Sequence, residues 1–311
     1  FTLHARVQKP QGRGRFDNRP TRYEPAKTNM TRTDMLSSDQ EELRMLRESA
    51  RTLFERAGSA GRSRKLRDAD GGWDADMIRE LAEAGVFGVT VPEDNGGLGM
   101  GLAAGGVIAE EVGRVIAPEP VVVTVGLSLG LLRRLCPQHA MMDQIIGGET
   151  VLAVAWQERG PNGGPVEASC RYDGGKLTGS KAWVVGAVGA DGFLVVADSD
   201  AGPVMVLAEA KASGLSFEKT AQADGSAMGE LTFSGTPAEL LADGTAVQGA
   251  LAEAISDATA LAAAELIGLN DRAFEITLDY IKTVPYTHLT LPTKRIVEIT
   301  GGPVNINKQL H

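Results

Sequence analysis

The sequence predicts an α+β multidomain protein with an N-terminal helical domain, a small antiparallel β barrel or sandwich, and a helical C-terminal part. Three observations support this fold class. Apolar residues recur at helical spacing across residues 36–150, short strand-like runs separated by turns fill residues 151–244, and residues 245–283 form an Ala-rich helical stretch. The chain has 311 residues, of which 43% are hydrophobic, so it can bury a core in more than one domain.

Charge is distributed unevenly along the chain. Residues 1–29 carry a net charge of +5 and lack apolar periodicity, so we interpret them as a disordered or non-native leader rather than a basic nucleic-acid-binding arm. Residues 30–283 carry a net charge of −16, which argues against a nucleic-acid partner. No apolar run reaches the ~20 residues of a membrane span. Two cysteines and no signal peptide favour a cytoplasmic location, and a structural zinc site is not expected.

Residues 36–150 contain the periodicity of several helices. One helix begins after Ser38 or Asp39, and a second follows Asp74, which has the side chain of an N-cap, and ends at Gly85. An extended link is predicted for residues 86–92. Further helices are predicted at residues 102–115, 121–135 and 138–146.

The pattern changes to strands at residue 151. Turn signals such as Asp173-Gly174-Gly175 separate the apolar runs and indicate an antiparallel arrangement. A single long helix is predicted for residues 245–282. The expected strands are 151–156, 168–172, 176–185, 193–197, 204–207, 215–219 and 231–233.

Two glycine motifs match known site patterns. Gly99, Gly101 and Ala104 form a G-x-G-x-x-A match, but the preceding strand-like run ends too early for a dinucleotide-binding turn, which favours a structural loop. Residues 126–130 match G-x-S-x-G, which would make Ser128 the nucleophile of a serine hydrolase. The body of the chain offers only His139 as a partner, so a helix with small residues at a packing contact is the favoured interpretation.

Four other side chains carry chemistry worth testing. Glu110, Glu111 and Glu158 are carboxylates that we interpret as solvated, because most such residues are. Trp183 follows a turn on a predicted strand. It is either a core aromatic of the β domain or an indole packed against a flat cofactor ring.

Taken together, several segments resemble the acyl-CoA dehydrogenase family. The resemblance covers about residues 36–283, and its combination of motifs is specific although each motif alone is weak. Within the family the chain looks most like the small-subunit type of pimeloyl-CoA dehydrogenase. The segments that carry the resemblance are Leu81–Gly88, Val91–Gly99, Glu110–Arg114, Gly147–Glu149, Gly179–Trp183 and Ala273–Thr283.

The resemblance implies a FAD-dependent enzyme that acts on an acyl-CoA thioester. A carboxylate would remove the α proton while the β hydrogen leaves as hydride to the flavin, giving a trans-2-enoyl-CoA. An electron-transfer partner would reoxidise the flavin, and the intact protein would be a homo- or hetero-oligomer. The positions implied to contact FAD are Val154, Trp156, Gln157, Gly163, Trp183 and Val185.

The chain departs from the family pattern in two regions. Where the family has Thr-Glu-Pro-Gly-x-Gly-Ser-Asp, this chain has residues 157–164 with Gln157 in the place of Thr, and Val185 replaces a threonine near the ring. Residues 284–311 read as a non-family tail in place of three further helices, so the C-terminal helical bundle is incomplete. The usual catalytic Glu lies in that missing part. Some relatives carry it earlier, where this chain has Ala258 beside Asp257.

Two functional hypotheses follow from the resemblance. The first is a truncated FAD-dependent acyl-CoA dehydrogenase that is inactive as this chain alone. The second is a non-catalytic subunit of a heteromeric acyl-CoA dehydrogenase, motivated by the altered flavin segment. The serine hydrolase based on Ser128 remains the alternative of another class.

Overall fold

The computed structural model describes residues 38–57, 60–68, 72–159, 170–223 and 225–283. The chain divides into two compact units, Phe1–Glu41 and Glu42–His311. In the unit Phe1–Glu41 only the start of the first helix is described. The fold and the site described below belong to the unit Glu42–His311. The predictions made for residues 1–29, 284–311 and Gly163 lie outside the described residues.

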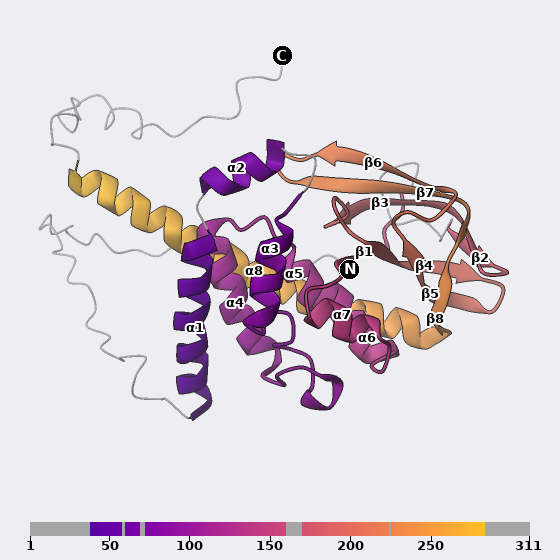
Figure 1. Ribbon diagram of the computed structural model, residues 1–311, viewed down its shortest axis with the longest axis horizontal. Coiled ribbons are helices and arrows are strands. Elements are labelled where there is room, and N and C mark those ends of the chain that lie inside the picture. Colours follow the sequence, from indigo (N-terminus) through magenta and orange to yellow (C-terminus); the bar gives the residue numbers. More distant parts are fainter. Residues whose placement is uncertain (1–37, 58–59, 69–71, 160–169, 224, 284–311) are drawn as a thin grey trace, which may run out of the picture. The chain divides into compact units, whose positions relative to one another are not determined.

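The first part of the chain folds into helices (Figure 1). Asp74 is confirmed as an N-cap, since its Oδ1 accepts a hydrogen bond of 2.9 Å from the Asp76 N–H. The elements are α1 (Ser38–Ala57), α2 (Ala60–Asp68), α3 (Ala75–Glu83), the 3-10 turn η1 (Glu93–Asn95), α4 (Gly101–Val115), α5 (Val121–Val123), the π-helical turn η2 (Thr124–Ser128), α6 (Leu129–Leu135) and α7 (Met141–Ile146).

The glycine-rich segment folds back on the residues before it. Residues 86–90 form consecutive turns, so the prediction of an extended link was wrong. The Gly99 N–H donates to the Val91 carbonyl at 2.8 Å, and the Met100 N–H donates to the Val89 carbonyl at 3.0 Å. A Cβ on Gly97 would lie 2.1 Å from the Val91 carbonyl oxygen, so the fold requires glycine there. The structural-loop interpretation of this motif is confirmed.

The strands form one eight-stranded sheet in the order β6-β7-β3-β2-β4-β5-β8, with β1 paired to β4 (Figure 1). The pairs β1–β4 and β2–β4 are parallel and the others are antiparallel, so the prediction of an antiparallel arrangement was wrong for these two pairs. The strands are β1 (Leu152–Ala155), β2 (Arg171–Asp173), β3 (Lys176–Val185), β4 (Gly192–Ser199), β5 (Gly202–Glu209), β6 (Leu215–Ala221), β7 (Ala227–Pro237) and β8 (Glu239–Asp243).

Strand β1 separates two buried clusters. Leu152 and Val154 belong to the cluster shared with the helices, whereas Ala153 and Ala155 belong to the cluster inside the sheet. This alternation follows from the two-residue period of a strand. The residues after β1 therefore emerge where the sheet meets the helices.

Helix α8 (Thr245–Thr283) packs along α4 (Figure 1). The two backbones approach closely at Gly113 and Gly268. Beyond this crossing α8 is exposed. The predicted fold class, which includes the start of a C-terminal helical bundle, is confirmed. The exposed apolar side chains of this part are Leu266, Ile267, Leu269, Phe274, Ile276, Leu278, Tyr280 and Ile281.

Among the described residues, no helix combines the length and the apolar character needed to cross a bilayer.

Candidate functional site

Residues 156–158 leave β1 and run beside β3. The Ala182 N–H donates to the Gln157 carbonyl at 3.0 Å, and this bond holds the segment against the middle of the neighbouring strand. Trp156 and Gln157 are both half-buried. Within the described part of the chain the side-chain amide of Gln157 makes no hydrogen bond, so it can both donate to and accept from a ligand.

A buried ion pair lies beneath this segment. The Lys181 Nζ is 2.6 Å from the Glu158 Oε1, and the two side chains are 2% and 5% exposed. The same Oε1 accepts a hydrogen bond of 3.1 Å from the Cys170 N–H, and the Lys181 Nζ is 3.5 Å from the Trp156 carbonyl oxygen. The interpretation of Glu158 as a solvated carboxylate was wrong, because Lys181 and the backbone compensate its removal from water.

Trp183 lies in a β-bulge. The register of β3 against β7 shifts between Lys181 and Val184, so one extra residue is accommodated, and Trp183 has φ 54. The Arg159 guanidinium lies over the Trp183 ring, 5.4 Å from its centroid, and pairs with Glu230. Bulges turn a side chain away from the regular strand alternation, and here the half-buried side chain is an indole.

The end of β3 reaches the helical part of the chain. A Cβ on Gly186 would lie 3.2 Å from the Val123 side chain and 3.4 Å from Pro120, next to the start of α5. Val185, immediately before it, is 44% exposed. The bulge and the segment after β1 therefore lie at the boundary between sheet and helices.

The structure brings some of the six predicted flavin-contact residues together. Trp156 and Gln157 are joined to the strand that carries Trp183 and Val185 by the bonds described above. The side chain of Val154 is buried in the core shared with the helices. Gly163 lies outside the described residues.

The chemistry of this site fits a planar heteroaromatic ring with a polar edge. Two half-buried indoles and an exposed valine provide apolar surface, and Gln157 provides an amide that both donates and accepts. Cys170 does not add a nucleophile, because burial raises the pKa of its thiol to about 11.

Ser128 has the wrong environment for a nucleophile. It lies in η2 between helical segments, not at a strand-to-helix elbow, and it is buried. Its Oγ donates to the Leu152 carbonyl at 2.6 Å, which ties η2 to β1. The geometry contradicts the serine hydrolase hypothesis, because that mechanism needs an exposed hydroxyl beside a base.

The alternative position expected for a catalytic carboxylate, at Asp257 and Ala258, lies in a contact between helices. The Asp257 Oδ2 accepts hydrogen bonds of 2.5 Å from Arg133 and 2.8 Å from Arg134, which fixes α6 to α8. Ala258 packs against Gly126, whose added Cβ would lie 2.6 Å from the Ala258 Cα. Asp257 is thus part of a structural contact.

Two further carboxylates are more deeply buried than their sequence context suggests. Glu111, interpreted as solvated, is buried and accepts hydrogen bonds of 3.0 and 2.8 Å from Arg51. Glu119 is buried against Arg62 of α2, which pairs with it. Glu111 joins α4 to α1, and Glu119 joins the loop before α5 to α2; no local pattern indicates such distant partners.

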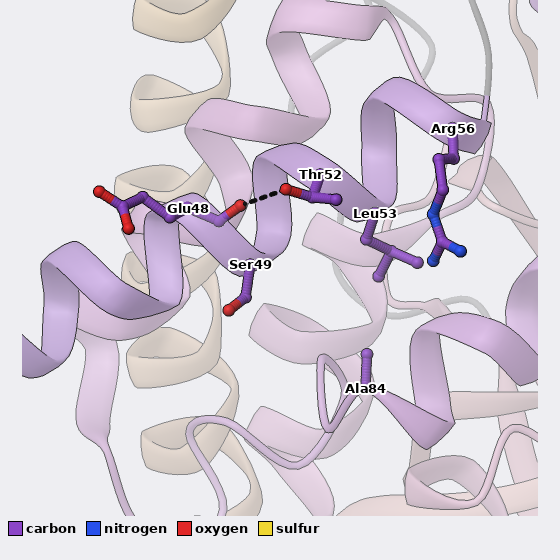
Figure 2. Close-up of a pocket in the computed structure, with 6 residues that line it drawn as sticks. All are labelled: Glu48, Ser49, Thr52, Leu53, Arg56 and Ala84. Atoms are coloured by element: carbon purple, nitrogen blue, oxygen red, sulfur yellow. Dashed lines mark hydrogen bonds between the residues drawn. The ribbon is translucent and has the colours of Figure 1, made fainter.

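Two shallow surface depressions lie elsewhere. One, of about 420 Å³, is lined by α1 and the end of α3, and Figure 2 shows the Thr52 hydroxyl bonded to the Glu48 carbonyl along its wall. The other, of about 390 Å³, adjoins the glycine-rich loop. Neither is lined by the residues of the bulge or by those after β1.

Comparisons with known proteins place the chain among dehydrogenases. A family model described as the acyl-CoA dehydrogenase N-terminal domain matches residues 40–136. Acyl-CoA dehydrogenase FadE28 of Mycobacterium tuberculosis is 31% identical over 69% of this chain and 60% of its own length. Acyl-CoA dehydrogenase FadE27 of the same organism is 27% identical over 75% of this chain and 62% of its own length. The chain thus spans about 60% of the length of these curated relatives.

Solved structures agree with this assignment. A variant of the Tcur3481-Tcur3483 steroid ACAD is 32% identical with a TM-score of 0.70, covering 84% of this chain and 72% of that one. The ChsE4-ChsE5 complex from Mycobacterium tuberculosis, 24% identical with a TM-score of 0.68 over 80% of this chain and 68% of that one, shares the fold. The chain belongs to the acyl-CoA dehydrogenase family.

Proposed function

We propose that this chain is the N-terminal and middle part of a FAD-dependent acyl-CoA dehydrogenase subunit that converts an acyl-CoA thioester to a trans-2-enoyl-CoA. Family membership supports the reaction class. The observation that carries the proposal is that Gln157 and Trp183 are held close together at the boundary between sheet and helices. In this proposal residues 36–150, 151–244 and 245–283 are the N-terminal, middle and C-terminal domains.

The residues of this chain would bind and orient the flavin. The Gln157 amide would hydrogen-bond the polar edge of the ring, while Trp156, Trp183 and Val185 would exclude water from it. Val154 would contribute through its backbone, because its side chain is buried, and Gly163 completes the proposed set. Bound FAD supplies the hydride acceptor of the reaction.

In this proposal none of the described residues serves as the catalytic base. Ala258 has no ionisable side chain, and Asp257 is bonded to two arginines. The base would come from a further C-terminal part of the protein, as the family resemblance implies. We therefore propose that this chain alone does not turn over acyl-CoA.

The second candidate is a non-catalytic subunit of a heteromeric acyl-CoA dehydrogenase. Two relatives of known structure carry the names of two proteins, Tcur3481-Tcur3483 and ChsE4-ChsE5, which supports a hetero-oligomeric assembly. The substitution of a threonine by Gln157 and of another by Val185 supports weak flavin binding. In either case an electron-transfer partner would reoxidise the flavin.

Flavin titration distinguishes the two candidates. We expect the purified chain to bind FAD, measured by quenching of flavin fluorescence, and Trp183→Ala to weaken binding at least tenfold. Val185→Thr restores a hydroxyl at an exposed position and should tighten binding. Trp73→Phe, which retains an aromatic ring against Gly189 outside the bulge, is the matched control. Absence of FAD binding by the chain, with binding restored in a heteromer, would favour the non-catalytic subunit.

The acyl group is a separate question. The pimeloyl-CoA small-subunit type remains a prediction from the sequence, and the 32% identical relative is named a steroid ACAD. A panel of CoA thioesters tested on the assembled protein, with dicarboxylic and steroid acyl groups, would decide between them. We also propose a cytoplasmic location, supported by two cysteines that are both free.

A further inference from the structure

We infer that the buried Lys181–Glu158 ion pair is a positioning device that fixes the flavin-contacting bulge. The inference rests on the proposed function, since it concerns residues that would lie behind the flavin site. Neither side chain is available to a ligand, because they are 2% and 5% exposed. Both are therefore positioning residues rather than catalytic ones.

The pair is almost completely removed from water. Burying two charges costs much of their mutual attraction, and an apolar pair of similar volume often stabilises a fold as well or better. Here the charges satisfy specific polar groups. The Glu158 Oε1 accepts from both the Lys181 Nζ and the Cys170 N–H, which connects the segment after β1 to the start of β2. In this inference the Lys181–Glu158 pair supplies conformational specificity rather than stability.

The contacts of the pair enclose the residues proposed to touch the ring. Glu158 follows Gln157, and Lys181 lies at the first residue of the register shift that contains Trp183. The Lys181 Nζ also approaches the Trp156 carbonyl, and the intervening Ala182 N–H bonds to Gln157. Three contacts thus link residues 156–158 to residues 181–182 of β3. Each contact involves a residue that lies within two positions of a proposed ring contact.

The bulge needs such an anchor because its backbone is unfavourable. Trp183 has φ 54, a value that L-residues other than glycine rarely adopt. Without the pair, β3 could pair with β7 in regular register, and the indole would turn to the other face of the strand. In this inference the ion pair favours the shifted register because it holds Lys181, the residue at which the shift begins, against the segment after β1.

The test separates positioning from stability. Lys181→Met removes the ammonium that is paired with the buried Glu158 carboxylate, so the single variant should lose both thermal stability and FAD affinity. The double variant Lys181→Met/Glu158→Gln removes both charges, keeps a side-chain oxygen that can accept from the Cys170 N–H, and should recover the midpoint of thermal unfolding. We expect it to bind FAD at least tenfold more weakly than the unaltered chain, because the register is no longer specified. Arg171→Met, which removes the cation of an exposed pair with Asp200 on the same sheet, is the control and should change neither quantity.

A second readout needs no flavin. In a Trp73→Phe/Trp156→Phe background, the fluorescence of Trp183 reports its surroundings, and the double variant should show greater quenching by acrylamide. Unchanged quenching together with unchanged FAD affinity in the stable double variant would overturn the positioning role. Failure of the unaltered chain to bind FAD, with quenching still altered by the double variant, would instead overturn the proposed function and retain the structural role of the pair.

Discussion

Replacing Gly268 by alanine tests the crossing of α4 and α8. A Cβ built on Gly268 would lie 1.8 Å from the Glu110 carbonyl oxygen, whereas an ordinary contact begins near 3.4 Å. Both groups belong to helix backbone, so no flexible side chain can yield. The two helices would have to separate locally by roughly 1.5 Å, which reduces the dispersion contacts along the crossing.

Two opposing contributions set the magnitude. Alanine is favoured over glycine within a helix by about 1 kcal/mol. Overpacking of a close contact costs about 1–3 kcal/mol, and the upper end applies where backbone meets backbone. We therefore expect Gly268→Ala to lower the free energy of unfolding by about 2 kcal/mol.

Gly249→Ala is the matched control on the same helix. No atom lies within 4 Å of a Cβ built at Gly249, so only the helix-propensity contribution remains, and the variant should be stabilised by about 0.5–1 kcal/mol. Urea unfolding followed by far-UV circular dichroism would measure both variants, provided that their m-values agree. Equal stability of the two variants would refute the close backbone crossing.

Three other predictions concern buried ionisable groups. Burial raises the pKa of Glu265, so the charged form of this side chain destabilises the fold at neutral pH. Glu265→Gln should therefore raise the free energy of unfolding at neutral pH, and this gain should disappear below the ordinary Glu pKa of 4.5, as chemical unfolding across pH would show. Arg62→Met leaves the Glu119 carboxylate buried without its partner and should lower the midpoint of thermal unfolding, by an amount equivalent to about 2–3 kcal/mol; an unchanged midpoint would contradict the pairing. Burial raises the pKa of Cys136 and Cys170 to about 11. Both thiols should therefore alkylate about 100-fold more slowly at pH 7 than a thiol of pKa 9.0, and the alkylation rates should rise towards pH 11. Rapid alkylation at pH 7 would count against this burial.

Local signals explain the parts of the fold that the sequence predicts well. Asp74 caps α3 through a bond to the residue two positions ahead, so the cap is encoded within one turn. Strand β3 occupies the residues expected, Lys176–Val185, because the Asp173-Gly174-Gly175 turn fixes its start. Such features depend on neighbours in sequence, and a pattern can reveal them.

Features that depend on partners far away in the chain cannot be predicted from a local sequence pattern. Helix α2 is short and polar, and Arg62 anchors it to a carboxylate 57 residues away. Strand β8 is mostly exposed and exists through its pairing with β5. The π-helical turn η2 faces α8 at Gly126, where only a residue without a side chain allows the approach.

The candidate site also combines features that the sequence indicates with features that depend on distant partners. Trp183 could be singled out from its place after a turn, and Gln157 from the family motif it alters. The charges that connect their neighbours, Glu158 and Lys181, are 23 residues apart and follow no spacing rule. Their pairing depends on how the mixed sheet places the segment after β1 beside β3, which only the folded chain displays.

The backbone angle of Trp183 has a consequence for laboratory evolution. A positive φ costs a residue with a side chain about 1–3 kcal/mol, a penalty that glycine does not carry. Selection of a mutant library for heat resistance alone should therefore enrich glycine at this codon, whereas selection in the presence of a ring-shaped ligand should retain the indole. The outcome at one codon would report which of the two pressures dominates.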